Sequence, residues 1–273
     1  MKDNSYQVSG YDMANDFPFE LWETYSDADL KSFSVATQSG LMPGMQKFFH
    51  ATMSKYTGRG KTCMVAGPIT VALVCNRSAG TLVQGAVTKW YTLGTITATA
   101  GSTSTLTHVA KFIANEQVGN FVYVLDNASG AGGAPEAEVA QIIKNTADVL
   151  TFQPPLTVAV ANNDTAEIFS TSQVIAAASG DSRPEVAGVV IAPDGIPDNY
   201  WGWVVQRGRV MTKIPGAITK NKSLITGAGI AVISSATLAD LTIGYSITTV
   251  TADLVSELAM AYIDILSVLG TTA

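Results

Sequence analysis

From about residue 61 onward, the chain consists of short apolar runs separated by Gly, Pro, Asn and Asp. The runs are rich in Val, Ile, Thr and aromatic residues, as is typical of β-strands, and include TVALVC, NFVYVLD, YWGWVVQRGRVM and AGIAVIS. Successive runs lie roughly 8–15 residues apart, a spacing typical of sandwiches and barrels. The pattern therefore predicts a mainly β protein, built as one or more antiparallel sandwich or barrel-like domains with a partly helical or irregular N-terminal segment.

Four stretches also fit a helical period. A short helix is predicted over 27–38, ended by Gly40 and Pro43, and a second over 45–55, where Met45 and Phe48 share a face. Residues 134–149 place Val139, Ile142 and Ile143 on one side of a helix. The stretch 252–269 has apolar residues at a spacing of four, but its part YIDIL also alternates as a strand.

Residues 1–60 differ from the rest by their density of Phe, Trp, Tyr and Met. We interpret 1–60 as an N-terminal arm or subdomain that packs on a neighbour. Residues 61–273 form the β-rich part, with a division into two β lobes near 126–150. The candidate docking residues are the apolar aromatics of the arm: Phe17, Phe19, Trp22, Phe48 and Phe49.

Charge narrows the classes of partner. Charged residues make up 14% of the chain, against about 25% in typical proteins, and the net charge is −6. Nucleic-acid binding usually requires a basic surface, so we expect no nucleic-acid partner. The first residues lack the apolar core of a signal peptide, and no apolar run approaches the ~20 residues that span a bilayer, so we expect no membrane partner.

Cys63 and Cys75 fit two buried free thiols better than a disulfide, although a disulfide stays open.

No motif in the sequence selects a catalytic, cofactor-binding or metal site. His50 and His108 have no partner at metal-ligand spacing, and no serine lies in a GxSxG motif. The run TGRGKT lacks the first glycine of a phosphate-binding loop, and SGAGGAP matches no dinucleotide-binding motif. The carboxylate pairs Glu136/Glu138 and Asp194/Asp198 are interpreted as turn residues. We therefore expect a protein that is not an enzyme and that uses no cofactor.

The most distinctive run is DNYWGWVVQRGRV, which contains Tyr200, Trp201, Gly202, Trp203 and Gln206. By alternation, Trp201, Trp203 and Val205 share one face of a strand, as expected for a core strand with an aromatic anchor. The run resembles a YxWVQxxG signature of head-decoration and related virion proteins of tailed bacteriophages. Here it carries one extra valine, so that WVVQ stands in place of WVQ.

Other pieces follow in an order similar to that family, over about residues 60–268: TLVQGAV, NTADVLTFQPPLTVA, GIAVIS and IGYSI. Proteins of the family close with a strand, which favours a strand at YIDIL. Residues 1–60 match no part of the resemblance.

The resemblance implies a capsid-decorating, cement or head-fibre protein that binds the assembled shell and stabilises it. Its implied partners are the major capsid protein or other virion proteins and further copies of itself, with a trimer favoured. Its implied location is the capsid surface of the virion, after synthesis in the host cytoplasm. Two alternatives stay open: a receptor-binding or tail-fibre module that stacks host glycans on Tyr91, Tyr200 or Tyr245, and a β-fold polysaccharide hydrolase.

Overall fold

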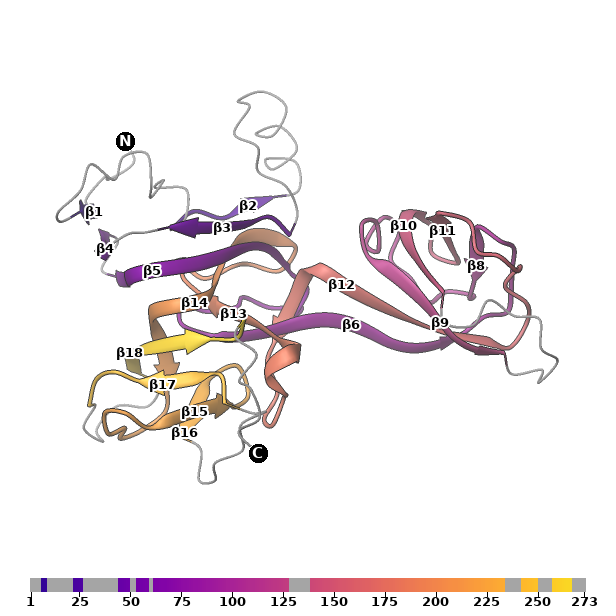
Figure 1. The fold of residues 1–273 in the computed structure, drawn as a ribbon. Helices are drawn as coiled ribbons and strands as arrows, with labels where there is room; N and C mark the ends of the chain where they lie inside the picture. The colour runs from indigo at the N-terminus through magenta and orange to yellow at the C-terminus, as the bar shows by residue number, and fades with distance from the viewer. Residues whose placement is uncertain are drawn as a thin grey trace. The chain divides into compact units, whose positions relative to one another are not determined.

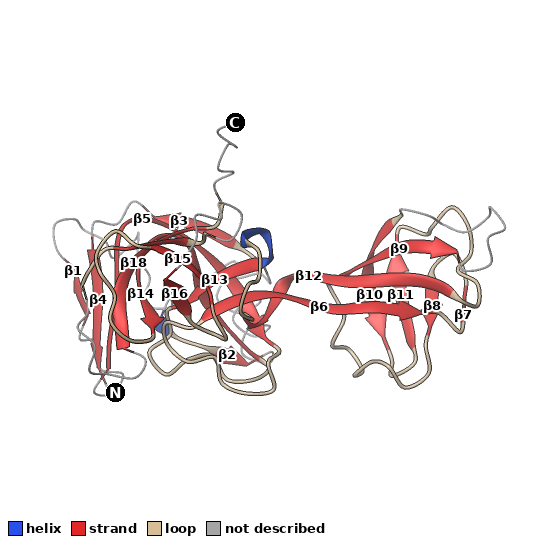
Figure 2. Ribbon diagram, turned by 90° about the horizontal axis from the view of Figure 1, so that it is seen from below, coloured by secondary structure: helices blue, strands red, loops and turns tan. Residues whose placement is uncertain are grey.

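The computed structural model describes residues 6–8, 22–26, 44–49, 53–58, 61–127, 138–233, 242–249 and 257–266. Within these ranges the regular structure is almost entirely antiparallel strand, as Figure 2 shows, and includes no α-helix. This confirms the predicted mainly β fold. The chain forms two compact units: unit 1 comprises 1–90 and 172–273, and unit 2 comprises 91–171.

Two long strands, β6 (Val87–Thr97) and β12 (Asp164–Ala176), carry the chain out of unit 1 and back into it. Unit 2 is therefore an insertion between two parts of unit 1, whereas the sequence analysis placed a division near 126–150. The insertion cannot be recognised in the sequence, because no linker interrupts either of the two strands that connect the units.

Unit 1 is built around two long strands, β5 (Lys61–Asn76) and β14 (Tyr200–Ile214), which pair along most of their length. Strand β14 also pairs with β2, β13 and β18, and β5 also pairs with β3 and β4 (Figure 1). The remaining strands of the unit are β1 (Tyr6–Val8), β2 (Tyr25–Ser26), β3 (Gln46–Phe49), β4 (Met53–Gly58), β13 (Val186–Val190), β15 (Ser223–Thr226), β16 (Ala231–Ile233), β17 (Gly244–Ser246) and β18 (Glu257–Asp264).

Strand β14 changes its pairing register twice, between Val205 and Arg207 and again between Arg207 and Arg209. Such bulges add residues to one strand and bend it. Gly208 lies in the second bulge with φ +119°, a conformation that glycine adopts far more readily than other residues. A Cβ there would lie 2.6 Å from Cγ2 of Ile69 and 2.7 Å from the carbonyl oxygen of Pro68. The bend thus requires both the backbone freedom and the small size of glycine.

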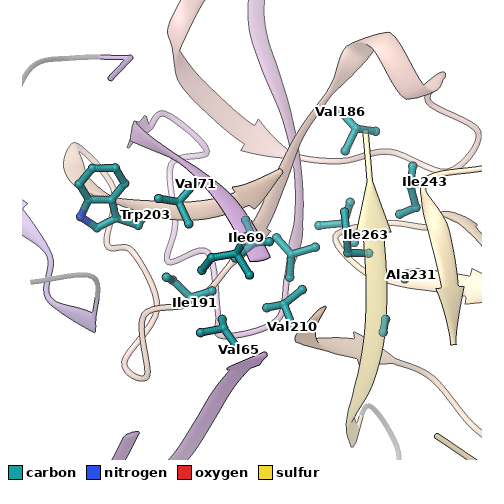
Figure 3. Close-up of a cluster of buried hydrophobic side chains, with 14 of the residues drawn as sticks. Val65, Ile69, Val71, Val186, Ile191, Trp203, Val210, Ala231, Ile243 and Ile263 are labelled. Atoms are coloured by element: carbon teal, nitrogen blue, oxygen red, sulfur yellow. The ribbon is translucent and has the colours of Figure 1, made fainter. Parts of the chain in front are cut away.

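The core of unit 1 is filled by aliphatic side chains around Trp203, the largest fully buried residue. Figure 3 shows Trp203 beside Val71, with Ile69, Val210 and Ile263 further along the same cluster. These residues come from β5, β14 and β18, so the apolar faces of strands distant in sequence meet in one interior. Burial of this apolar surface is the main favourable contribution to folding.

Unit 2 has its own core, which includes Leu106, Val122, Ile142, Leu150 and Phe152. Strand β9 pairs with β10 and β12, β10 pairs with β11, and β11 pairs with β8. The strands that belong wholly to this unit are β7 (Ala100–Gly101), β8 (Thr105–Thr107), β9 (Phe121–Asn127), β10 (Val139–Asn145) and β11 (Val149–Gln153).

Two helix predictions are wrong, and a third lies outside the described residues. The range 45–55 contains β3 and the start of β4, because backbone pairing with β5 outweighs the local helical spacing. The described part of 134–149 contains β10, in which Val139 and Ile143 are exposed on one face and Ile142 is buried on the other, so apolar residues on both faces produce the helix-like spacing. The range 27–38 is not described. At YIDIL the predicted strand is confirmed through Asp264, the end of β18.

Candidate interaction surfaces

The aromatic run on β14 builds the core of unit 1. Trp203 is 1% exposed, and Trp201 is also buried. Gly202, on the opposite face, is small enough for Ile196 to pack against it, since a Cβ there would lie 2.7 Å from Ile196 Cγ1. Tyr200, 38% exposed, begins the strand at the surface.

The pairing register of this run changes just after Val205. Val205 keeps the register, pairing with Val71 of β5 and Val189 of β13, and the register shifts at the following residue, Gln206. Gln206 is buried in the bulge, where its backbone carbonyl accepts a hydrogen bond from the Ile265 N–H at 3.1 Å. Gln206 is therefore the residue without a register partner on β5 in this bulge.

The residues proposed for docking in the N-terminal arm do not form one surface. Trp22 and Phe49 are buried in the core of unit 1 together with Tyr25, because β2 and β3 pair with its central strands. Phe48, on the other face of β3, is 55% exposed. Phe17 and Phe19 lie outside the described residues. The interpretation of Trp22 and Phe49 as docking residues is therefore wrong.

Across the described part of the chain, no group of three or more His, Cys, Asp or Glu side chains converges on a metal-sized site. The carboxylate of Asp198 accepts hydrogen bonds from the Ala79 N–H and the Asn199 side chain. Glu138 likewise accepts the Thr157 N–H at 2.9 Å. These two carboxylates hold loops together. Cys75 is buried, and its Sγ lies 3.8 Å from the carbonyl oxygen of Asn76. None of the described helices is long and apolar enough to cross a membrane.

Unit 2 presents a group of exposed aliphatic side chains on the loop 108–120, between β8 and β9. Val109 is 67% exposed and Ile113 is 68% exposed, more than any other large apolar residue of the described chain. Val118 on the same loop and Ile143 on β10 are also exposed. We call these four residues the aliphatic tip. All four lie on one loop and the strand that this loop is hydrogen-bonded to, and exposed apolar patches on soluble proteins often mark interaction sites.

Hydrogen bonds to β10 and the turn after it hold this loop in one conformation. The buried side chain of Asn145 donates to the Ile113 carbonyl at 2.7 Å and accepts from the Gln117 N–H at 2.9 Å. The Asp148 carboxylate accepts the Ala110 N–H at 2.6 Å. Phe112, between Val109 and Ile113, is buried in the core of unit 2. The loop therefore exposes its aliphatic side chains without being free to withdraw them.

A second surface lies on the outer face of β14, β18 and β17 in unit 1. Arg209 pairs in register with Tyr262, which pairs in register with Tyr245. The two tyrosine rings stack with their centroids 5.1 Å apart and an interplanar angle of 24°. Arg207 lies opposite Asp264 at an N···O distance of 3.5 Å. We call this set of residues the tyrosine–arginine face.

Two neighbours on this face stabilise the charged form of Arg207. A hydrogen bond with the side chain of Tyr262 raises the pKa of its guanidinium, and the negative charge of Asp264 raises this pKa further. The face combines an aromatic stack with two guanidinium groups and one carboxylate, that of Asp264, on a chain whose net charge is −6.

No protein family, curated protein or solved structure matches this chain significantly. The function must therefore be argued from the two surfaces. Sequence analysis named Tyr245 as a stacking residue but missed its partners on β18 and β14. The aliphatic tip was missed because the run TLTHVAKFI, residues 105–113, is typical of a strand by its sequence, whereas the strand β8 ends at Thr107.

Proposed function

We propose that this chain is a non-enzymatic structural protein of a virus particle, which binds the outer surface of the assembled capsid shell and stabilises it. The observation that carries the proposal is the aliphatic tip of unit 2, held by hydrogen bonds in an exposed conformation. The resemblance of the β14 run and its neighbours to phage head-decoration proteins supports the same reading. Its partner is the major capsid protein, and the decorating species is a homo-oligomer, with a trimer favoured.

The order and the apolar character of the aliphatic tip are properties expected of a surface that docks onto a preformed shell. A loop that is already ordered loses little conformational entropy on binding, so more of the contact energy remains as affinity. The core of a protein interface is apolar and poor in charge, which matches Val109, Ile113, Val118 and Ile143. The exposed Lys111 and Lys144 flank the tip, as expected for the polar rim of such an interface.

Co-sedimentation with assembled shells tests the proposal. The shells are assembled from the major capsid protein encoded by the same genome and mixed with the purified full-length chain. We expect the chain to pellet with them, and to do so also at about half-molar salt, where the Debye length is under ~5 Å and exposed ion pairs are screened. Sedimentation velocity on the unbound protein measures its oligomeric state.

Two variants and one control locate the contact. Ile113→Asp and Val109→Asp place a charge in the proposed interface without disturbing the core, because both side chains are exposed in the free chain. Each should reduce pelleting, whereas Val158→Asp, an exposed aliphatic position of unit 2 outside the tip, should not. If the full-length chain does not pellet with the shells, the proposed function is refuted. Equal binding by all three variants shows that another surface docks.

A further inference from the structure

We propose that the tyrosine–arginine face of unit 1 is a binding site for acidic saccharides, that is, for sugars carrying a carboxylate such as uronic acids. The site is distinct from the aliphatic tip and does not depend on capsid binding. It is formed by Tyr245 as the stacking surface, by Arg209 as the anion-binding group, and by the paired Arg207 and Asp264 as further hydrogen-bonding groups beside it.

The aromatic part of the site is an exposed ring with a rigid support. Tyr245 is 46% exposed and stacks with Tyr262, whose own neighbour in register is Arg209. One face of the Tyr245 ring is thus supported by another ring, while much of the side chain remains open to solvent. Pyranose rings present a face of C–H groups that packs on such an aromatic surface, and aromatic side chains supply large contact area at low entropic cost.

The polar part of the site favours a negative ligand. Arg207 is engaged by Tyr262 and Asp264, which fix the position of its guanidinium. Arg209 lies on the same face, is exposed, and forms no ion pair with any residue of the described ranges. A guanidinium binds a carboxylate through two parallel N–H···O hydrogen bonds, which gives both affinity and orientation.

The arrangement of these groups across the sheet matches the size of a short oligosaccharide. Arg209, Tyr262, Tyr245 and Ser223 form one row of register partners over four adjacent strands. Neighbouring strands lie about 4.8 Å apart, so the row extends over about 14 Å. A single stacked sugar fills only part of this length. The row therefore fits two or three sugar units, one on Tyr245 and a carboxylate near Arg209.

Titration of the full-length protein with trigalacturonic acid, followed by ligand-observed NMR and calorimetry, tests the site. The methyl-esterified trisaccharide has the same rings without the charge, and should bind about tenfold more weakly, because a tenfold change corresponds to ~1.4 kcal/mol and charge-assisted hydrogen bonds contribute about that much or more. Arg209→Gln should weaken binding of the acid by a similar factor and leave the affinity for the ester unchanged.

Tyrosine variants separate stacking from charge. Tyr245→Ala should abolish measurable binding, Tyr245→Phe should retain it because the ring remains, and Tyr200→Ala, at another exposed tyrosine, should match the unchanged protein. Absence of binding to the acid at millimolar concentration overturns the proposal, as does a Tyr245→Ala variant that binds normally. If hexaglutamate binds as tightly as the sugar, the face recognises acidic peptides instead.

The same variants keep this site separate from the proposed capsid function. Tyr245→Ala should pellet with shells as the unchanged protein does, and Ile113→Asp should bind trigalacturonic acid normally. Failure of one assay therefore leaves the other interpretable.

Discussion

Replacing Trp203 by alanine tests whether the aromatic run on β14 is structural. Trp203 is 1% exposed and lies in register with Leu73 of β5, inside the main core cluster of unit 1 (Figure 3). The Lys47 Nζ lies 5.6 Å from the centroid of its ring. Because β14 is paired on both sides, its backbone cannot move inward to fill the space that the indole leaves. We therefore expect a cavity and a large loss of stability.

The magnitude follows from the buried area. A buried aromatic side chain removes about 150–250 Å² from water, which at ~25 cal/mol per Å² corresponds to about 4–6 kcal/mol as an upper limit. Loss of the Lys47 contact adds about 0.5–1 kcal/mol. One effect opposes these: the indole Nε1–H has no hydrogen-bond partner among the described residues, and its removal relieves a desolvation cost of about 1–3 kcal/mol. We expect a net loss of about 3–5 kcal/mol, as for other large aromatic truncations.

Urea denaturation followed by far-UV circular dichroism measures this loss without relying on tryptophan fluorescence. Thermal melts should show a fall in Tm of about 6–20 °C for a unit of this size. Trp203→Phe should cost less than Trp203→Ala, because it keeps most of the ring volume and removes the unpaired donor. Tyr200→Ala, at the exposed start of the same strand, should change stability by less than about 0.5 kcal/mol. A Trp203→Ala variant that loses under ~1 kcal/mol would refute the assignment of this residue to the core.

Three further predictions concern stability. Gly208→Ala should lower the Tm of unit 1 strongly in a thermal melt, because its Cβ would clash with the backbone at Pro68. Gly94→Ala, also at positive φ but in open space, serves as the control and should show only the smaller cost of backbone strain. Asp181→Asn should cost about 1–3 kcal/mol in urea denaturation, because Lys89 Nζ lies 3.0 Å from the half-buried carboxylate and loses its charged partner. Hydrogen bonds from Ser182 lower the pKa of Glu185 below its usual value of 4.5. The contribution of Glu185 to the free energy of unfolding is therefore present above that pH and lost as the pH falls through the folded-state pKa. The difference in stability between the unchanged chain and Glu185→Gln should be small at pH 7, since Glu185 lies near the surface, and should vanish in acid.

The strand runs could be predicted from local sequence because burial and alternation coincide in them. In β14, Trp201, Trp203 and Val205 on one face and Val204 on the other are apolar and buried, so this strand read by itself shows that it lies in the core. In β10, apolar residues lie on both faces, with Ile142 buried and Val139 and Ile143 exposed, and their spacing made a strand look helical. Which of these residues are covered depends on the elements packed against the strand, and a local pattern does not contain them.

The functional surfaces could be predicted only in part, for the same reason. Sequence composition marked the aromatics of residues 1–60 as surface contacts, but Trp22 and Phe49 are covered by strands that come from elsewhere in the chain. Tyr245 and Tyr262 are far enough apart in sequence that nothing local links them, yet strand pairing stacks their rings.

The sequence by itself determined the β class of this protein, its low charge and the apolar character of its central strand, because these follow from residue types and from the two-residue period of a strand. Only the tertiary structure decided that residues 91–171 form an inserted unit, that the N-terminal aromatics contribute to the core, and that Arg209 meets two tyrosines on an open face. These features depend on which strands pair and in which register. Pairing is settled by the combined burial of many strands at once, and no single segment of the chain carries that information.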